Sequence, residues 1–200
     1  MEIVLISCPS SIDGEIDFIH SMFEQGLRVF HIRKPGYNEN QIAEYIEQIE
    51  PVFHSRIKIH SSFELLDRYR LGGIHTPVAM IAKNNVIDSK EHKNISISCS
   101  FHSVDEVKRK FYNIDYAFLS PVFDSISKSN YKGRFNYIGI RDVLLLAKTR
   151  IFALGGCKAN NLNQVKQLGF SGAAILGAVW NSSDPVSSYI EIKKVAAALT

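Results

Sequence analysis

Paired cysteines, long apolar runs and a strong excess of one charge are all missing from this sequence. Its three cysteines, Cys8, Cys99 and Cys157, are far apart and form no C-x-x-C or Cys/His group, so we predict neither a disulfide framework nor a zinc site. No apolar run approaches the roughly 18 residues that a membrane-spanning helix needs. The net charge of +3 is small and the basic residues are scattered, which argues against binding to nucleic acid or to a membrane surface.

Nucleotide-binding and export signals are also absent. Neither G-x-x-x-x-G-K-[ST] nor G-x-G-x-x-G occurs. The start, MEIVLISCPSS, has no basic region before its short apolar run, so it predicts a first strand and not a signal peptide. We therefore expect a cytoplasmic protein in a reducing compartment.

What the sequence does contain is a regular alternation of strand-like and helix-like stretches. The clearest unit is 151–180, where two apolar runs flank an amphipathic helix and each run ends at glycine. Runs that are apolar at nearly every position suit parallel strands covered on both faces. Eight such units follow one another, and the 46% hydrophobic fraction is enough for one core. The predicted strands are 2–7, 27–32, 56–60, 73–75, 95–99, 116–119, 151–154 and 173–176.

This alternation predicts an α/β fold, and specifically a single-domain (β/α)8 TIM barrel over residues 1–200. A doubly wound sheet is the competing architecture. Two hundred residues lie at the lower end for a barrel, so most loops have to be tight. The predicted helices are 14–25, 42–49, 63–69, 104–111, 138–148, 160–168 and 184–199, with a weak helix or turn within 76–94.

Polar residues gather where the predicted strands end, and in a barrel those ends share one face. They include His31 and Arg33, His60, Ser100 and His102. Arg33 either pairs with an acidic neighbour or binds an anionic substrate, and both interpretations stay open. Glycines after the last two strands, where barrels commonly bind phosphate, predict a phosphate site; these are Gly155, Gly156 and Gly177. The long polar loop 120–136 has the length of a lid.

Several segments in order resemble the thiamine phosphate synthase/TenI family. They are FHIRKPG (30–36), IHSSFELL (59–66), GGIHT (72–76), SCSFHSVDEV (98–107), DYAFLSPVFDSISK (115–128) and ALGGCKANN (153–161). The resemblance covers nearly the whole chain. It implies a (β/α)8 barrel that binds a thiazole phosphate, held by the backbone at the three glycines. It also implies that the substrate-binding residues are Arg33, Ser100, Ser125, Ser127 and Lys128.

The chain departs from the synthases of that family at several positions, two of which concern the metal. The resemblance places magnesium-binding aspartates where this chain has Ser61 and Met80. Serine and methionine do not replace carboxylates as ligands of a hard cation. We therefore expect no metal and no cofactor, with Mg²⁺ required only if the chain is a true synthase.

The missing aspartates make the chain more similar to the TenI branch, whose members are thiazole tautomerases. They shift a proton within a thiazole carboxylate phosphate, and their base is a histidine just after the sixth strand, where this chain has Pro121. The base is then expected to be another histidine. We favour His60, with His102 and His31 as alternatives.

Three functions therefore stay open. They are a metal-independent thiazole tautomerase, which we favour, a magnesium-dependent thiamine phosphate synthase, and a non-catalytic protein that binds thiazole or thiamine phosphate. The expected partner is a small-molecule thiazole phosphate. Analogy with other small barrels suggests a homodimer.

Overall fold

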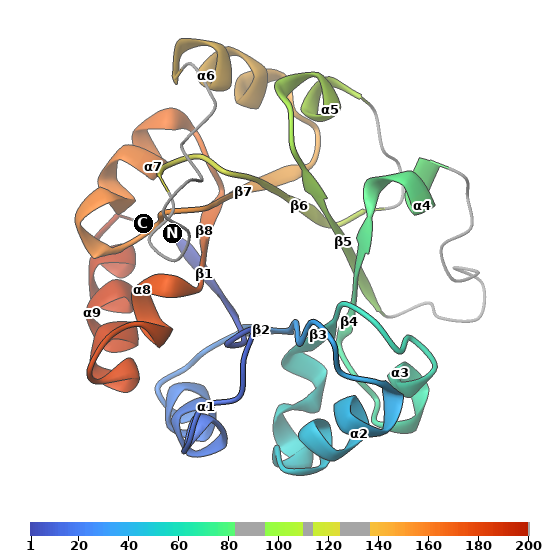
Figure 1. Cartoon of the computed structure of the whole chain (residues 1–200). Coiled ribbons are helices and arrows are strands. Elements are labelled where there is room, and N and C mark those ends of the chain that lie inside the picture. The colour runs from blue at the N-terminus through green and yellow to red at the C-terminus, as the bar shows by residue number, and fades with distance from the viewer. Residues whose placement is uncertain (83–94, 110–113, 125–136, 200) are drawn as a thin grey trace.

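Eight parallel strands close into a barrel in the computed structural model, which describes residues 1–82, 95–109, 114–124 and 137–199 (Figure 1). The strands pair in chain order, and β8 pairs with β1. That closing pair confirms the (β/α)8 TIM barrel and excludes the doubly wound sheet. The strands are β1 (Glu2–Ile6), β2 (Val29–Ile32), β3 (Ile57–Ile59), β4 (Gly73–Pro77), β5 (Ser96–Phe101), β6 (Tyr116–Leu119), β7 (Arg150–Leu154) and β8 (Gly172–Ile175).

Helices surround the barrel on the outside (Figure 1). The α-helices are α1 (Glu15–Glu24), α2 (Glu39–Glu47), α3 (Leu65–Arg68), α4 (Val78–Ala82), α5 (Val104–Lys108), α6 (Tyr137–Leu146), α7 (Leu162–Leu168), α8 (Gly177–Trp180) and α9 (Pro185–Ala198). The 3₁₀ helix η1 (Pro51–Arg56) and the short α8 were not predicted, and the 3₁₀ helix η2 (Ala159–Asn161) overlaps the start of the helix predicted over 160–168. Each is a single turn or two, too short to give a periodic pattern.

Helix starts follow the capping residues in the sequence. The Asp184 carboxylate accepts a hydrogen bond from the backbone of Ser187 and begins α9, at the boundary predicted for this helix. The Ser103 hydroxyl likewise accepts from the backbone of Glu106 and begins α5. The Glu106 carboxylate accepts a hydrogen bond from the backbone of His102, which fixes the turn before α5.

Two strands extend at their carboxyl ends beyond the predicted boundaries. Strand β4 continues to Pro77 and β5 to Phe101, each two residues further than expected. Ser98 and Ser100 point into the barrel and bind His75 of β4, so β5 remains a strand through residues that look like a loop in the sequence. The predicted ends were wrong because a polar residue at a barrel-facing position resembles the end of a strand.

The interior of the barrel is divided into an apolar half and a polar half. Strands β6, β7, β8 and β1 contribute apolar and aromatic side chains, which form their own core cluster of Val4, Ile6, Tyr116, Phe118, Phe152 and Ala174. Strands β2 to β5 contribute buried polar side chains, namely His31, Lys58, His75 and Ser98. Burying polar groups is costly unless they are hydrogen-bonded, so this second half has to form a connected network.

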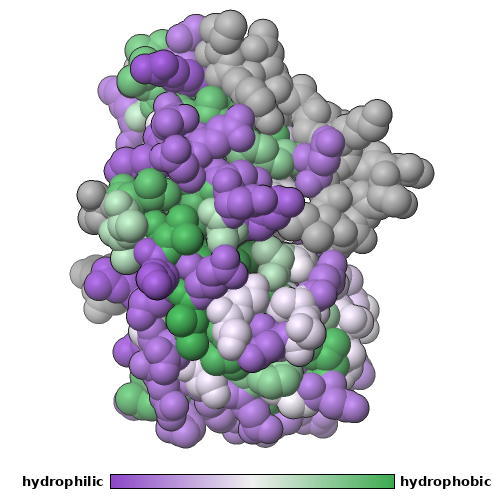
Figure 2. Space-filling model, turned by 90° about the vertical axis from the view of Figure 1, so that its left-hand side faces the viewer, coloured by the Kyte–Doolittle hydropathy of each residue, from purple (hydrophilic) through white to green (hydrophobic). Residues whose placement is uncertain are grey.

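The outer surface is mixed in character. Hydrophilic residues are spread over the face shown in Figure 2, with hydrophobic ones between them. Among the described residues, the exposed large hydrophobic side chains are Val52, Met80, Leu145, Leu146 and Ile190. Within those same ranges, none of the helices combines the length and the apolar character needed to cross a bilayer.

Candidate active site at the carboxyl ends of the strands

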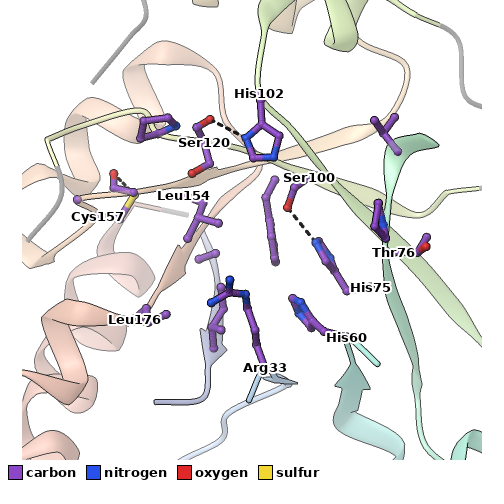
Figure 3. A pocket seen from close by; sticks show the side chains of 18 of the residues that line it. Arg33, His60, His75, Thr76, Ser100, His102, Ser120, Leu154, Cys157 and Leu176 are labelled. Carbon is purple, nitrogen blue, oxygen red and sulfur yellow. Dashed lines mark hydrogen bonds between the residues drawn. The ribbon is translucent and has the colours of Figure 1, made fainter. Parts of the chain in front are cut away.

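A pocket of about 590 Å³ opens at the carboxyl ends of the strands (Figure 3). Ligands of TIM barrels bind at this face because the loops that follow all eight strands meet there. The lining side chains come from strands on opposite sides of the barrel. They include Arg33, His60, His75, Thr76, Ser100, His102, Ser120, Pro121, Cys157 and Leu176, together with Gly155, Gly156 and Gly177.

Arg33 is a cation directed into this pocket from the end of β2 (Figure 3). Its backbone is held from both sides by Ser7, whose hydroxyl accepts from the Arg33 N–H at 2.8 Å and donates to the Arg33 carbonyl at 3.1 Å. No carboxylate within the described part of the chain forms an ion pair with its guanidinium. Of the two interpretations of Arg33, the binding of an anion is the one its surroundings favour.

Three histidine rings lie in contact at the floor of the pocket. They are His31 of β2, His60 just after β3 and His75 of β4. The Nδ1 atom of His31 lies 3.0 Å from Nε2 of His60, and the rings of His60 and His75 are stacked with centroids 4.2 Å apart. His31 is completely buried and lies below the pocket lining, whereas His60 and His75 form part of the lining.

Hydroxyl groups hold the outer nitrogens of these rings. The Tyr116 hydroxyl lies 2.6 Å from Nε2 of His31, and the Ser98 and Ser100 hydroxyls lie 2.9 Å from Nδ1 and Nε2 of His75. The Ser98 hydroxyl donates to the Ile74 carbonyl, so it accepts from Nδ1–H of His75. The lone pair of His75 is therefore on Nε2, where the Ser100 hydroxyl donates to it.

Burial keeps all three rings uncharged. It is the largest cause lowering the pKa of His31, with His60 and His75 adding to the effect. Burial, then His75 and Arg33, lower the pKa of His60. Burial, then Arg33 and His102, lower the pKa of His75 to about 3. The floor of the pocket is thus neutral, and the charge in the pocket comes from Arg33.

His102 lies at the mouth of the pocket, on the loop between β5 and α5 (Figure 3). Its Nδ1 lies 3.3 Å from the carbonyl oxygen of Ser120. A carbonyl oxygen can only accept, so the ring proton lies on Nδ1 and the lone pair is on Nε2. This contact also places the ring beside Ser120–Pro121, where the chain leaves β6.

The glycine turn after β7 lies against the segment that leaves β6. Gly155 and Gly156 have φ values of +94° and +66°, a region that side chains disfavour. A Cβ on Gly156 would lie 2.3 Å from the carbonyl oxygen of Asp124, and one on Gly155 would lie 2.9 Å from Pro121. Close packing therefore requires both glycines, and their backbone borders the pocket together with Gly177 at the start of α8.

The pocket contains most, but not all, of the residues expected from the sequence. Arg33, His60, Ser100, His102 and the three glycines line it, and His31 lies beneath it. The predicted Ser125, Ser127 and Lys128 lie outside the described residues. The importance of Tyr116 and Ser98 was missed. The alternation of serine and apolar residues in SISCSF (96–101) is a signal of interior polar positions that could have revealed Ser98.

A magnesium ion does not fit the donors found here. None of the described residues that line the pocket carries a carboxylate. Ser61, at one of the two positions implied for magnesium ligands, is exposed, and Met80, at the other, accepts a hydrogen bond from Thr76 through its sulfur. Mg²⁺ requires oxygen ligands, usually carboxylates, so the described lining of the pocket does not provide a site for it.

Comparisons with known proteins give a consistent result. A family model described as thiamine monophosphate synthase matches residues 3–179. A thiamine-phosphate synthase of Leuconostoc citreum is 24% identical over 174 residues, which cover 83% of this chain and 81% of the relative. One from Methanococcus maripaludis is 27% identical over 183 residues, covering 90% and 87%.

Solved structures agree with the sequence comparisons. A thiamine phosphate pyrophosphorylase of Bacteroides thetaiotaomicron superposes with a TM-score of 0.77 at 27% identity, with 98% of each chain covered. A second one, from Pyrococcus furiosus, has a TM-score of 0.79 at 16% identity and covers 99% of this chain and 96% of its own; it supports the fold alone.

Proposed function

The chain belongs to the thiamine monophosphate synthase family, and from that premise we propose that it is a thiazole tautomerase that binds a thiazole carboxylate phosphate. This reaction needs a site for the anionic groups and one side chain that takes up a proton and returns it elsewhere. It needs no metal for the proton transfer itself. The pocket lining offers a cation, a glycine turn and a histidine, without any carboxylate among its described residues.

The observation that carries this proposal is the place of His102. The tautomerases that the sequence resembles have their base immediately after the sixth strand, where this chain has Pro121. His102 reaches that place from the end of β5, and its contact with the Ser120 carbonyl leaves the Nε2 lone pair available. His102, on the loop after the neighbouring strand β5, thus supplies the base that Pro121 cannot.

The roles of the other groups follow from their chemistry. Nε2 of His102 takes the proton from a carbon of the non-aromatic ring, and the electron pair of that C–H bond becomes part of the aromatic system. The imidazolium then returns the proton at a second position, so that the enzyme ends unchanged. Arg33 pairs with an anionic group of the substrate, and the backbone at Gly155, Gly156 and Gly177 is the proposed phosphate site.

His60, which the sequence favoured as the base, stays a testable alternative. Its Nε2 is engaged with His31 at 3.0 Å, so only Nδ1 could accept a proton from a substrate. His31 is completely buried and cannot reach a ligand without movement of His60. Both facts make His102 the better candidate.

Turnover of the thiazole carboxylate phosphate by the purified protein tests the proposal. We expect His102→Gln to lower kcat by about 10²- to 10⁴-fold, the usual contribution of general acid–base catalysis. Phosphate affinity measured by calorimetry should be preserved in that variant. If His102→Gln kept full activity and His60→Gln lost activity, the general base would be His60 and not His102.

The printed names of the relatives support a second function, thiamine phosphate synthase. That reaction joins a pyrimidine pyrophosphate to the thiazole phosphate with the help of Mg²⁺. The lack of carboxylates among the described pocket residues argues against it. Mg²⁺-dependent formation of thiamine phosphate would overturn the tautomerase proposal, and binding without turnover in either assay would indicate a non-catalytic binding protein.

A further inference from the structure

We propose that His31, His60 and His75 form a binding site for a transition-metal ion such as Zn²⁺ at the floor of the pocket. This inference goes beyond the proposed function, because it concerns a different set of residues from the proposed base and does not depend on which reaction the protein catalyses. It also departs from the expectation, drawn from the sequence, that the chain binds no metal.

The three rings are close enough to share one ion. Each offers one ring nitrogen, and these atoms all lie within 4.8 Å of one another. Zinc binds histidine nitrogens at about 2.0–2.1 Å, so the nitrogens of a tetrahedral site are separated by roughly 3.3 Å. The Nδ1 of His31 and the Nε2 of His60, at 3.0 Å, need to separate only slightly to take an ion between them. The ion would replace the proton that these two nitrogens now share.

Outer hydrogen bonds of the kind found in metal sites are already present. A histidine ligand usually has its second nitrogen held by a hydrogen-bonding partner, which orients the ring. Tyr116 holds Nε2 of His31, and a serine lies at each nitrogen of His75, so one serine would remain bound whichever nitrogen turns to the metal. These partners all come from β5 and β6, on the rigid wall of the barrel.

The donor set selects the kind of ion. Three imidazoles with no carboxylate favour Zn²⁺, Cu²⁺, Ni²⁺ or Co²⁺ over Mg²⁺ or Ca²⁺. This site is therefore distinct from the magnesium site of the synthases that the sequence resembles.

An anion is the expected fourth ligand. Three protein ligands leave one coordination position open, and His60 and His75 line the pocket on that side. Arg33 lines the same pocket as His60 and His75, and Lys58 of β3 lies beside His31 of β2 in the sheet, so two basic side chains are close to the cluster. An anionic ligand, either hydroxide or an oxygen of a phosphate or carboxylate, would offset the added positive charge.

Metal binding can be measured without any substrate. The tag-free protein, stripped with a chelator, is titrated with Co²⁺ while its visible absorption is followed, and Zn²⁺ affinity is measured by competition with a chromophoric chelator. We expect one ion per chain, an intense four-coordinate Co²⁺ spectrum that Zn²⁺ abolishes, and a Zn²⁺ dissociation constant below about 1 μM. Weaker binding by the folded protein, or no Co²⁺ spectrum, would overturn the proposal.

Variants identify the ligands. His60→Gln and His75→Gln should each lose more affinity than the roughly 10- to 100-fold that removal of an outer hydrogen-bond partner costs, and Tyr116→Phe should fall within that range. His20→Gln, a change on α1 away from the pocket, is the matched control and should bind as the wild type does. Unchanged Zn²⁺ affinity in His75→Gln and Tyr116→Phe would refute the site even if His60→Gln fails to fold.

Discussion

Lys34 and Glu15 form an ion pair that is almost completely shielded from water. The Lys34 side chain is 0% exposed and the Glu15 side chain 5% exposed. The same carboxylate accepts from the backbone of Cys8 at 3.0 Å, and the same ammonium donates to the Ser10 carbonyl at 3.1 Å. The pair thus ties the loop after β1 to the end of β2, beside Arg33. An acidic partner was one of the two interpretations left open for Arg33 by the sequence, and it is the neighbouring lysine that has such a partner.

Breaking this pair should destabilise the protein strongly. Glu15→Gln leaves the Lys34 charge buried without its partner, and we expect a loss of about 3–5 kcal/mol in the free energy of unfolding. Urea denaturation measures it. Asp105→Asn removes the partner of Lys108, in a pair whose side chains are 77% and 58% exposed, and should cost less than about 1 kcal/mol. Equal losses in the two variants would show that burial is not the cause.

Removing the pocket cation should weaken the binding of the phosphate ligand. A hydrogen bond to a charged group contributes about 1.5–3 kcal/mol, so Arg33→Met should raise the dissociation constant for thiazole phosphate by roughly 10- to 100-fold. Calorimetric titration gives this value. Arg28→Met changes an exposed arginine that does not line the pocket and should leave the affinity unchanged. An effect of similar size in both variants would show that the net charge of the protein, and not a direct contact of Arg33 with the ligand, sets the affinity.

The glycine turn should not tolerate a side chain. Gly156→Ala puts a Cβ against the Asp124 carbonyl in a backbone conformation that alone costs an L-residue about 1–2 kcal/mol. We expect lower stability and weaker phosphate binding together. Gly139→Ala is the matched control, because a Cβ there meets nothing within 4 Å and helix α6 should gain about 0.5–1 kcal/mol. Thermal unfolding of the two variants should shift in opposite directions.

Two buried thiols should resist alkylation at neutral pH. Burial raises the pKa of Cys157 to about 12, and burial followed by the charge of Glu106 raises that of Cys99 to about 12. Only the thiolate reacts, so iodoacetamide should modify them at rates limited by opening of the fold.

The same shifts have a defined effect on stability. The folded-state pKa of Cys157 lies above the ordinary thiol value of 9.0, so the contribution of this buried, uncharged thiol to stability is complete below about pH 9 and is lost as the pH rises toward 12. The predicted resistance to alkylation is measured by mass spectrometry after timed labelling from pH 7 to 10, with guanidinium-unfolded protein as the reference. Equally fast labelling of both residues in the folded and unfolded states would contradict it.

Much of the candidate site could be predicted because strand ends can be located in the sequence. A barrel brings the carboxyl ends of all its strands to one face, so Arg33, His60, Ser100, His102 and the three glycines could be grouped from the sequence alone. The family resemblance, now confirmed by the match over residues 3–179, added the expected ligand, a thiazole phosphate. The partners of these residues could not be predicted in the same way. The contacts of His31 with Tyr116 and of His102 with Ser120 join residues from different strands, and no local pattern encodes such pairs.

The sequence by itself determined the order of the eight strands and the face that carries the pocket, because hydrophobic periodicity and turn glycines are local properties. It favoured closure into a barrel, and the long-range pair of β8 with β1 established it. Only the tertiary structure decided what each histidine does. It shows His31 buried under His60, His75 held between two serines, and His102 with its proton directed to the Ser120 carbonyl. Burial and the direction of a hydrogen bond are properties of neighbours that lie far away along the chain. The histidines within the described residues, which are chemically alike in the sequence, therefore differ in the folded protein.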